Sequence, residues 1–254
     1  MPSTIGITSS AVNQQKWDTL ITADAPYGWW KLNELTGNLV QSGSVGGAAT
    51  AYIQSSGRTT NAAALQTYSG STTNYSFNFN STATVSNRLN VTNFGTNIGS
   101  NNAVSMEMIF KINTSTGRAT FGRQRADALG WGLLTSVSTG NIYVTAWFGN
   151  IFTRGIDMNT LVSWDANKWY HVVYTYAPTE TCVYLNGKLI QSISHTSATF
   201  SDSSNNCDLF SSFGGSFDKS QSSNIDEMCM YKTTLTAAQV ANHALASGVL
   251  SNGN

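Results

Sequence analysis

Charged side chains are scarce in this chain. Its 254 residues include 13 Lys and Arg and 13 Asp and Glu, so the formal net charge is zero and only 10% of the residues are charged. An average domain has about 25%. Without a basic stripe the chain lacks the electrostatic footprint of a nucleic-acid-binding protein, so we expect no nucleic-acid partner. A neutral surface also lacks the self-repulsion that keeps monomers apart, which slightly favours assembly.

Long apolar runs are also missing. No run approaches the roughly 18 apolar residues that mark a membrane-spanning helix. The N-terminal residues MPSTIGITSSAVNQQKWDTL do not show the charged-then-apolar layout of a secretory signal. We therefore expect no membrane partner and no signal peptide.

Cysteine is rare, and the odd number excludes a fully paired set. Cys182, Cys207 and Cys229 each lie in an apolar or strand-like context, which favours small buried hydrophobes. One disulfide with one free thiol stays open as an alternative. No His or Cys cluster has the spacing of zinc ligands, so we predict no zinc site.

Strand patterns dominate what is present. The segment AVSMEMIFKI alternates strictly, as a half-buried antiparallel strand requires. Its apolar face comprises Val104, Met106, Met108, Phe110 and Ile112, and its polar face comprises Ser105, Glu107 and Lys111. Short strands follow at intervals of about ten residues, a spacing typical of a sandwich or barrel. Two weaker strand candidates lie around Tyr52 and Leu65.

Residues 169–189 predict two extended strands, a short loop and a hairpin closed by Asn186-Gly187. This pair favours a type I′ turn, because Asn tolerates positive φ and Gly adopts it freely.

One helix is well signalled, near the C-terminus. Thr236 and Gln239 have the spacing of a capping box, and Gly248 is placed to end the helix. Ala238, Ala241 and Leu245 form a stripe at helical spacing. The helix is too short and rich in alanine to be stable alone, so we expect it to pack on the sandwich.

The N-terminal residues 1–22 are polar and weakly patterned. We interpret them as an arm or a short helix that becomes ordered against a partner. No linker or fixed-period repeat interrupts the rest, so we predict that residues 23–254 form one domain.

Three segments in order resemble the laminin-G-like branch of the concanavalin A-like lectin and glucanase superfamily. The first is Trp169-Tyr170-His171-Val172-Val173 before the Asn186-Gly187 hairpin. The second is Ile225-Asp226-Glu227 followed by Leu235-Thr236-Ala237-Ala238-Gln239. The third, APYGWWKLNELTG, is similar to the opening strand of such domains in bacteriophage virion proteins. The resemblance implies an all-β jelly-roll sandwich of two antiparallel sheets with one short C-terminal helix.

Fold does not settle function in this superfamily, so the candidate sites have to be weighed. A glycosidase needs two carboxylates about 5 to 9.5 Å apart, and glucanases of this superfamily place them on one face of one strand. No two acidic residues here are separated by two or four positions, and Asp226 and Glu227 are adjacent, so regular pleating sends them to opposite faces. We therefore predict no catalytic residues. His171, His195 and His243 are expected to be structural or exposed.

Calcium is the one ion that the resemblance leaves open, since laminin-G-like domains often bind it through loop carboxylates and carbonyls. Asp157, Asp165, Asp202 and Asp208 lie in predicted loops, but their spacing does not match a dedicated calcium loop. We name no metal ligand.

Aromatic side chains are the candidate ligand-binding residues. Tyr143 and Trp147 share a strand face about 13 Å apart, which suits stacking on separate sugar rings. Trp131 precedes a glycine and is a candidate rim residue. The alternative is that all three pack inside the fold.

We expect a non-enzymatic structural protein of a bacteriophage virion surface, such as a capsid decoration or cement protein on the capsid exterior. Its partners would be other virion proteins or further copies of itself, contacted through the N-terminal arm. The first alternative is an adhesin that binds host-surface glycans, and the second is a polysaccharide-degrading glycosidase or lyase.

Overall fold

The computed structural model describes residues 9–32, 58–63, 75–79, 89–91, 103–123, 131–138, 141–148, 151–157, 165–196, 207–210 and 220–252. The strand candidates around Tyr52 and Leu65 lie outside these ranges. The helices are α1 (Ser9–Ala23), α2 (Ala237–Ser247) and the 3-10 helix η4 (Val249–Asn252). The strands are β1 (Gly28–Trp30), β2 (Arg58–Ala63), β3 (Tyr75–Phe79), β4 (Leu89–Val91), β5 (Val104–Ile112), β6 (Arg118–Arg123), β7 (Trp131–Ser138), β8 (Asn141–Phe148), β9 (Ile151–Asp157), β10 (Trp169–Ala177), β11 (Glu180–Leu185), β12 (Lys188–Ser194), β13 (Cys207–Leu209) and β14 (Ser223–Tyr231).

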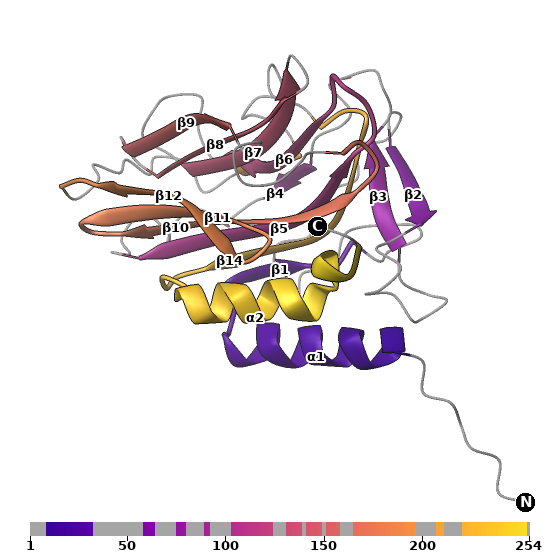
Figure 1. Cartoon of the computed structure of the whole chain (residues 1–254), viewed down its shortest axis with the longest axis horizontal. Helices are drawn as coiled ribbons and strands as arrows, with labels where there is room; N and C mark the ends of the chain where they lie inside the picture. The colour runs from indigo at the N-terminus through magenta and orange to yellow at the C-terminus, as the bar shows by residue number, and fades with distance from the viewer. Residues whose placement is uncertain are drawn as a thin grey trace, which may run out of the picture.

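The strands form two antiparallel sheets packed one on the other (Figure 1). The larger sheet has the order β12-β11-β10-β5-β14-β3-β2, with β1 also paired to β14. The smaller sheet has the order β4-β13-β6-β7-β8-β9. The predicted all-β jelly-roll sandwich with a short C-terminal helix is confirmed.

The main core lies between the two sheets. All five residues of the apolar face of β5 are buried in it, as the alternation predicted. Tyr170, Tyr174 and Tyr176 of β10 enter the same core, and so do the alternate residues Ile142, Val144, Ala146 and Phe148 of β8. Burial of these large side chains is the dominant stabilising term of the sandwich.

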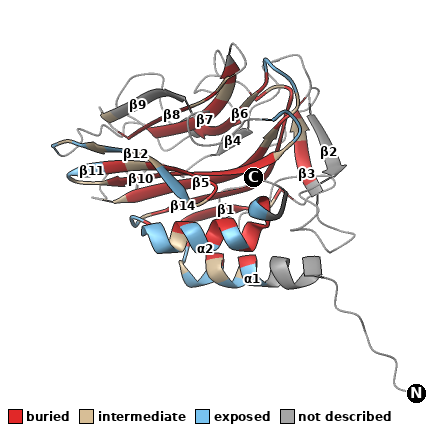
Figure 2. Cartoon of the chain, viewed as in Figure 1, coloured by how far each residue is buried: buried red, intermediate tan, exposed pale blue. Residues whose placement is uncertain are grey.

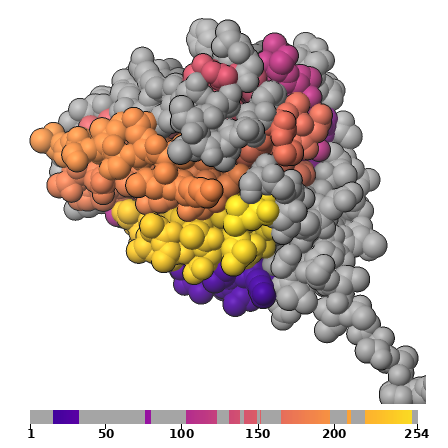
Figure 3. All heavy atoms as spheres, in the orientation of Figure 1, coloured from indigo at the N-terminus to yellow at the C-terminus, as the bar shows by residue number. Residues whose placement is uncertain are grey.

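A second apolar layer covers the outer face of the larger sheet (Figure 2). Helix α2 lies along this face and α1 packs beside it, which is plain in the space-filling view (Figure 3). The layer includes Trp17 and Ile21 of α1, Val240 and Ala244 of α2, and Ile109 of β5. The face of β5 that carries Glu107 is therefore buried, although its polarity predicted an exposed face.

The predicted hairpin turn is confirmed. Asn186 has φ 49° and Gly187 has φ 79°, so both central residues are left-handed, as a type I′ turn requires. Asn186 Oδ1 also accepts a hydrogen bond from the backbone N–H of His171 at 2.9 Å. The turn lies against α2, since a Cβ at Gly187 would be 3.0 Å from the Cβ of Ala244.

The caps of α2 and its packing on the sandwich are confirmed, but the stripe of Ala238, Ala241 and Leu245 is not the face that packs. Thr236 Oγ1 accepts from the backbone N–H of Gln239 at 3.2 Å, and the C-terminal cap is Gly248 with φ 79°. Ala238 and Ala241 are exposed and Leu245 is 66% exposed. The buried face is instead centred on Val240 and includes His243, Ala244 and Ser247. The helix has two faces of small residues, so its sequence does not show which face is buried. The buried face contains His243, whose polar partners come from segments distant in the sequence.

The N-terminal segment is helical from residue 9 and docks on its own chain. Trp17 and Ile21 are fully buried beside α2, and Lys31 forms an ion pair with Asp18 at 3.1 Å. The boundary between an arm of residues 1–22 and a domain of residues 23–254 stays a prediction. Within the described ranges, no helix combines the length and the hydropathy needed to cross a bilayer.

Candidate functional site

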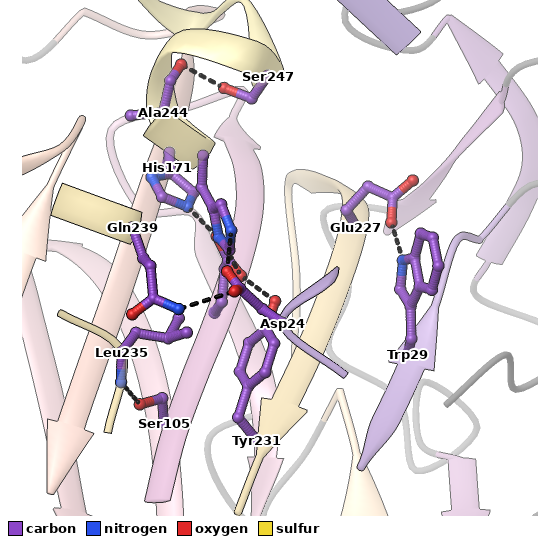
Figure 4. Close-up of polar contacts among 12 residues, drawn as sticks. Asp24, Trp29, Ser105, His171, Glu227, Tyr231, Leu235, Gln239, Ala244 and Ser247 are labelled. Carbon is purple, nitrogen blue, oxygen red and sulfur yellow. Dashed lines mark hydrogen bonds and ion pairs between the residues drawn. The ribbon is translucent and has the colours of Figure 1, made fainter. Parts of the chain in front are cut away.

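A cluster of ionisable side chains is centred on Glu107 of β5. Its members His171, Tyr231 and Asp24 are labelled in Figure 4. Glu107 Oε1 accepts from His171 Nε2 of β10 at 2.5 Å and from His243 Nδ1 of α2 at 2.9 Å. Glu107 Oε2 accepts from the hydroxyl of Tyr231 of β14 at 2.7 Å. On its other side, His243 Nε2 lies 2.8 Å from Asp24 Oδ2, just after α1. The cluster thus joins three neighbouring strands, α2 and the end of α1.

The electrostatics of the cluster favour charged Glu107 and charged His243. Burial alone would raise the pKa of Glu107, but His243 and His171 outweigh it and hold that pKa well below its usual range. Burial likewise acts to lower the pKa of His243, but Glu107 and Asp24 raise it above its ordinary value. Burial raises the pKa of Tyr231 well above its usual range, so its hydroxyl stays a donor.

This cluster is closed to solvent. Glu107 is 1% exposed, and His171 and His243 are 0% exposed. The ring of Trp17 covers both imidazoles, with centroid distances of 6.2 Å to His171 and 5.8 Å to His243. A substrate could not reach these groups without displacing α1, so the arrangement serves to hold the helices on the sheet. The expectation that His171 and His243 are structural or exposed agrees with this placement.

Two further contacts fasten the same layer. Ser105 Oγ accepts from the backbone N–H of Leu235 at 2.9 Å and donates to the carbonyl of Thr233 at 2.8 Å. Trp29 Nε1 donates to Glu227 Oε2 at 2.6 Å. Ser105, Trp29 and Glu227 are residues of the larger sheet, and each of these buried polar groups has a hydrogen-bond partner, as burial demands (Figure 4).

Asp226 and Glu227 do not follow regular pleating. The ladder between β14 and β5 shifts between Ile225 and Met228, so both acids oppose the single residue Ile109. Such a bulge disrupts the alternation of faces on which the sequence argument relied. Both side chains are buried, at 0% and 1% exposure.

The acids predicted to lie in loops are distributed differently. Asp157 ends β9 and Asp208 lies within β13, so both are strand residues, and Asp208 is buried. Asp165 is exposed beside a turn and pairs with Lys168 at 2.6 Å. Asp202 lies outside the described residues. In the part of the chain that the structure describes, no three His, Cys, Asp or Glu residues are grouped as metal ligands.

The candidate aromatic residues separate into two environments. Tyr143 and Trp147 lie on the outer face of the smaller sheet, because the alternate residues of β8 enter the core. Trp131 is not at a rim: it is fully buried and packs edge-on against Phe121 at 5.9 Å. A fully buried ring offers no face to a ligand, so the expectation of a rim residue is wrong.

Trp147 is nearly closed, at 4% exposure. Its ring lies directly against Gly132 of β7, where a Cβ would be 2.1 Å from the ring atoms. Tyr143 is half-buried and more open. The register places Ser136 of β7 and Asp157 of β9 opposite Tyr143, so one row of the sheet combines an aromatic residue with two polar ones.

The remaining histidine and the cysteines form no site among the described residues. The ring of His195 stacks on Tyr176 with centroids 5.5 Å apart. Cys182 and Cys229 are free thiols, and Cys229 is buried. Burial raises the pKa of Cys229 well above its usual range, so it stays a neutral thiol.

Sequence reasoning missed the Glu107 cluster. Glu107 stood on the polar face of a strand, and His171 and His243 were treated separately, 72 positions apart in the printed numbering. The available signal was a histidine inside each of two apolar segments, the strand of residues 169–173 and the C-terminal helix. A buried histidine needs polar partners, but the sequence does not say which ones.

Comparison with known proteins identifies the family. The laminin G pattern of the Concanavalin A-like lectin/glucanases superfamily matches residues 83–241. A comparison with curated proteins found no match.

Solved structures share the fold at low identity. The ligand-binding domain of botulinum neurotoxin serotype D, in complex with N-acetylneuraminic acid, has a TM-score of 0.59 at 16% identity, covering 89% of this chain and 52% of that one. Domain 4 of the extracellular arabinanase AbnA from Geobacillus stearothermophilus, in complex with arabinotriose, has a TM-score of 0.56 at 17% identity, covering 86% of this chain and 98% of that one. The chain spans about half the length of the neurotoxin domains that it matches. With the family pattern matched over more than half of its length, this chain belongs to the concanavalin A-like lectin/glucanase superfamily.

Proposed function

We propose that this chain is a non-catalytic binding module whose ligand is a carbohydrate. The observation that carries the proposal is the likeness over most of this chain to two domains whose structures hold sugars, arabinotriose in one and N-acetylneuraminic acid in the other. The arabinanase domain is matched over nearly its whole length, so the likeness covers a complete module of that enzyme.

The outer face of the smaller sheet is the surface that we assign to the ligand. Tyr143 offers a partly open ring there, and sugars stack on aromatic rings through their apolar C–H faces. Ser136 of β7, opposite Tyr143 in the register, supplies a polar position in the same row. A few placed polar groups around an apolar platform are typical of small-molecule sites. Trp147 lies four residues from Tyr143 on the same face of β8. Its ring is closed to solvent, so it stabilises this surface by packing on Gly132.

The absence of catalysis in this proposal rests on the acidic residues. Glu107, Asp226 and Glu227 are buried, and the hydrogen bonds of Glu107 are made to side chains of the protein itself. Hydrolysis requires two carboxylates that reach the same glycosidic bond. Release of reducing sugar from arabinan or any other polysaccharide would contradict this part of the proposal.

The test is glycan binding by calorimetry, with arabino-oligosaccharides and N-acetylneuraminic acid glycans as the first probes and a glycan array as the wider screen. Tyr143→Ala is expected to weaken binding about fivefold, since one ring contact contributes on the order of 1 kcal/mol. Leu245→Ala is the matched control, because Leu245 is exposed on α2, on the opposite side of the sandwich. Equal binding by wild type and Tyr143→Ala would move the ligand to another surface, and no binding to any glycan would overturn the proposal.

A second candidate is a structural role on a virion surface, as a capsid decoration protein that contacts neighbouring subunits. The near-complete burial of Trp147 favours it, because the largest ring of the candidate platform then serves as scaffold. The zero net charge is compatible with tight assembly. This candidate predicts that the chain sediments with particles in a symmetric copy number. A soluble monomer that never associates with particles would contradict it.

A further inference from the structure

His243 occupies an unusual position, because each of its ring nitrogens faces a carboxylate. Nδ1 lies 2.9 Å from Glu107 Oε1 and 3.2 Å from Glu107 Oε2. Nε2 lies 2.8 Å from Asp24 Oδ2. Ionised carboxylates only accept hydrogen bonds, and a neutral imidazole has one N–H. Both contacts are therefore satisfied only when His243 is an imidazolium.

His171 makes an instructive contrast on the same carboxylate. Its Nε2 donates to Glu107, while its buried Nδ1 has no hydrogen-bond partner among the described residues. Among the described residues, the ring of His171 therefore makes one hydrogen bond, to Glu107. The two histidines thus share Glu107, but only His243 is placed so that its contacts depend on a second proton.

Asp24 connects this proton to the N-terminal helix. Helix α1 ends at Ala23, and Asp24 is the next residue. Asp24 Oδ1 also accepts from Gln239 Nε2 at 2.7 Å (Figure 4). Two side chains of α2, Gln239 and His243, therefore bind the residue that follows α1. We propose that His243 is a proton-dependent clasp that fastens the N-terminal helix to the sandwich and loosens as the pH rises.

The groups that face His243 from each packed element act in a consistent direction. Glu107 of β5 and Asp24 after α1 are negative and favour the imidazolium. Tyr231 of β14 lies with its ring 6.4 Å from the imidazole and donates to Glu107, so it adds no charge. His171 of β10 shares Glu107 with His243. Trp17 of α1 packs its uncharged ring against both histidines.

The direction of the pH dependence follows from linkage. The pKa of His243 is raised in the folded state, so its stabilisation is fully present below the ordinary pKa of about 6.5. It is lost as the pH rises from there through the raised pKa. One proton is involved, so each pH unit within that window loosens the docking of α1 by about tenfold. Glu107 does not reverse this in mild acid, since its own pKa is lowered.

Loosening of the clasp would free a segment with apolar side chains. Trp17 and Ile21 are fully buried against the helix layer. Once α1 leaves, both become available to another surface. The segment interpreted from sequence as a partner-binding arm would then be held on its own domain by a proton.

Trypsin cleavage after Lys16 tests the clasp, because Lys16 is exposed on α1 but a docked helix resists proteolysis until it opens locally. The cleavage rate of the full chain is measured by mass spectrometry between pH 7 and 9, and divided by the rate for an unstructured peptide of residues 9–23 at each pH. For wild type the normalised rate is expected to rise by up to tenfold per pH unit and then level off.

Asp24→Asn is the matched variant, since the asparagine amide can donate to the Nε2 of a neutral His243 while its oxygen still accepts from Gln239. Its normalised rate is expected to be nearly independent of pH. Asp18→Asn is the control: it removes the ion pair of α1 with Lys31 but leaves the clasp, so the pH dependence should persist.

A measurement on wild type alone keeps the proposal open to refutation if a variant fails to fold. The ring ¹⁵N chemical shifts of His243 should report an imidazolium at pH 7 and deprotonation above it. A neutral His243 at pH 7, a flat wild-type cleavage profile, or an equally steep profile for Asp24→Asn would each overturn the clasp.

Discussion

Replacement of Glu107 by glutamine tests whether the buried cluster is organised around one charge. The carboxylate accepts from three donors, on His171, His243 and Tyr231. The glutamine amide has one acceptor oxygen, and its NH₂ group would face one of these donors. The imidazolium of His243 would also lose its buried counter-charge. Removal of one partner from a buried pair costs about 3–5 kcal/mol, so we expect a loss of that size in the free energy of unfolding.

The assay is urea unfolding followed by circular dichroism. With a slope of about 3 kcal/mol/M, the expected loss lowers the urea midpoint by about 1 to 1.7 M. Glu180→Gln is the matched control, because Glu180 is an exposed carboxylate on β11, and its midpoint should match that of wild type.

The pH dependence of this difference has a definite sign. The pKa of Glu107 is lowered in the folded state, so its stabilisation is present above the ordinary pKa of about 4.5 and is lost as the pH falls below it. Wild type and Glu107→Gln should therefore differ most above pH 5 and converge in strong acid. A variant within 1 kcal/mol of wild type at pH 6 would refute the argument that Glu107 is the charged centre of the layer.

Two further substitutions test the packing of the helix layer. Gly187→Ala should destabilise the fold by about 1–2 kcal/mol, because residue 187 has φ 79° and the new Cβ would lie 3.0 Å from Ala244; thermal unfolding checks this, and an unchanged melting temperature would contradict the turn geometry. Val240→Ala should cost about 2 kcal/mol for the two buried methyl groups that it removes, while Leu245→Ala on the exposed face should be nearly neutral. If Leu245→Ala lowered the free energy of unfolding more than Val240→Ala, the buried face of α2 would be the stripe that the sequence suggested.

The sequence determined the sandwich strands because their side-chain period is local information. The alternation of residues 104–112 assigned the correct inner face to β5, and the same period of two separates the core residues of β8 from Tyr143 and Trp147. The Asn186-Gly187 turn and the Thr236–Gln239 capping box were equally readable, since both depend on residues adjacent in the chain. The superfamily followed from three short segments in order, and the matched family pattern bears it out.

The candidate sites were only partly predictable. Tyr143 and Trp147 share one face of β8, as the period of two predicted, and only the structure places that face on the outside of the smaller sheet. Trp131 was misplaced, because the side of a strand that enters the core is not evident when both neighbours are apolar or small. Asp226 and Glu227 were misjudged, because a bulge depends on the partner strand and leaves little trace in local sequence.

Only the tertiary structure decided which polar groups are buried, and why they are tolerated there. Sequence patterns report the side-chain period, so Glu107 was assigned to a polar and therefore exposed face. The helix layer covers that face, and a buried charge then requires partners from distant segments: His171, His243 and Tyr231, with Asp24 beyond. The sequence by itself determined the strands, the turns and the family. The docking of α1 and α2 brought scattered polar residues into one connected cluster. Because these residues are removed from water there, each depends on the others for its hydrogen bonds.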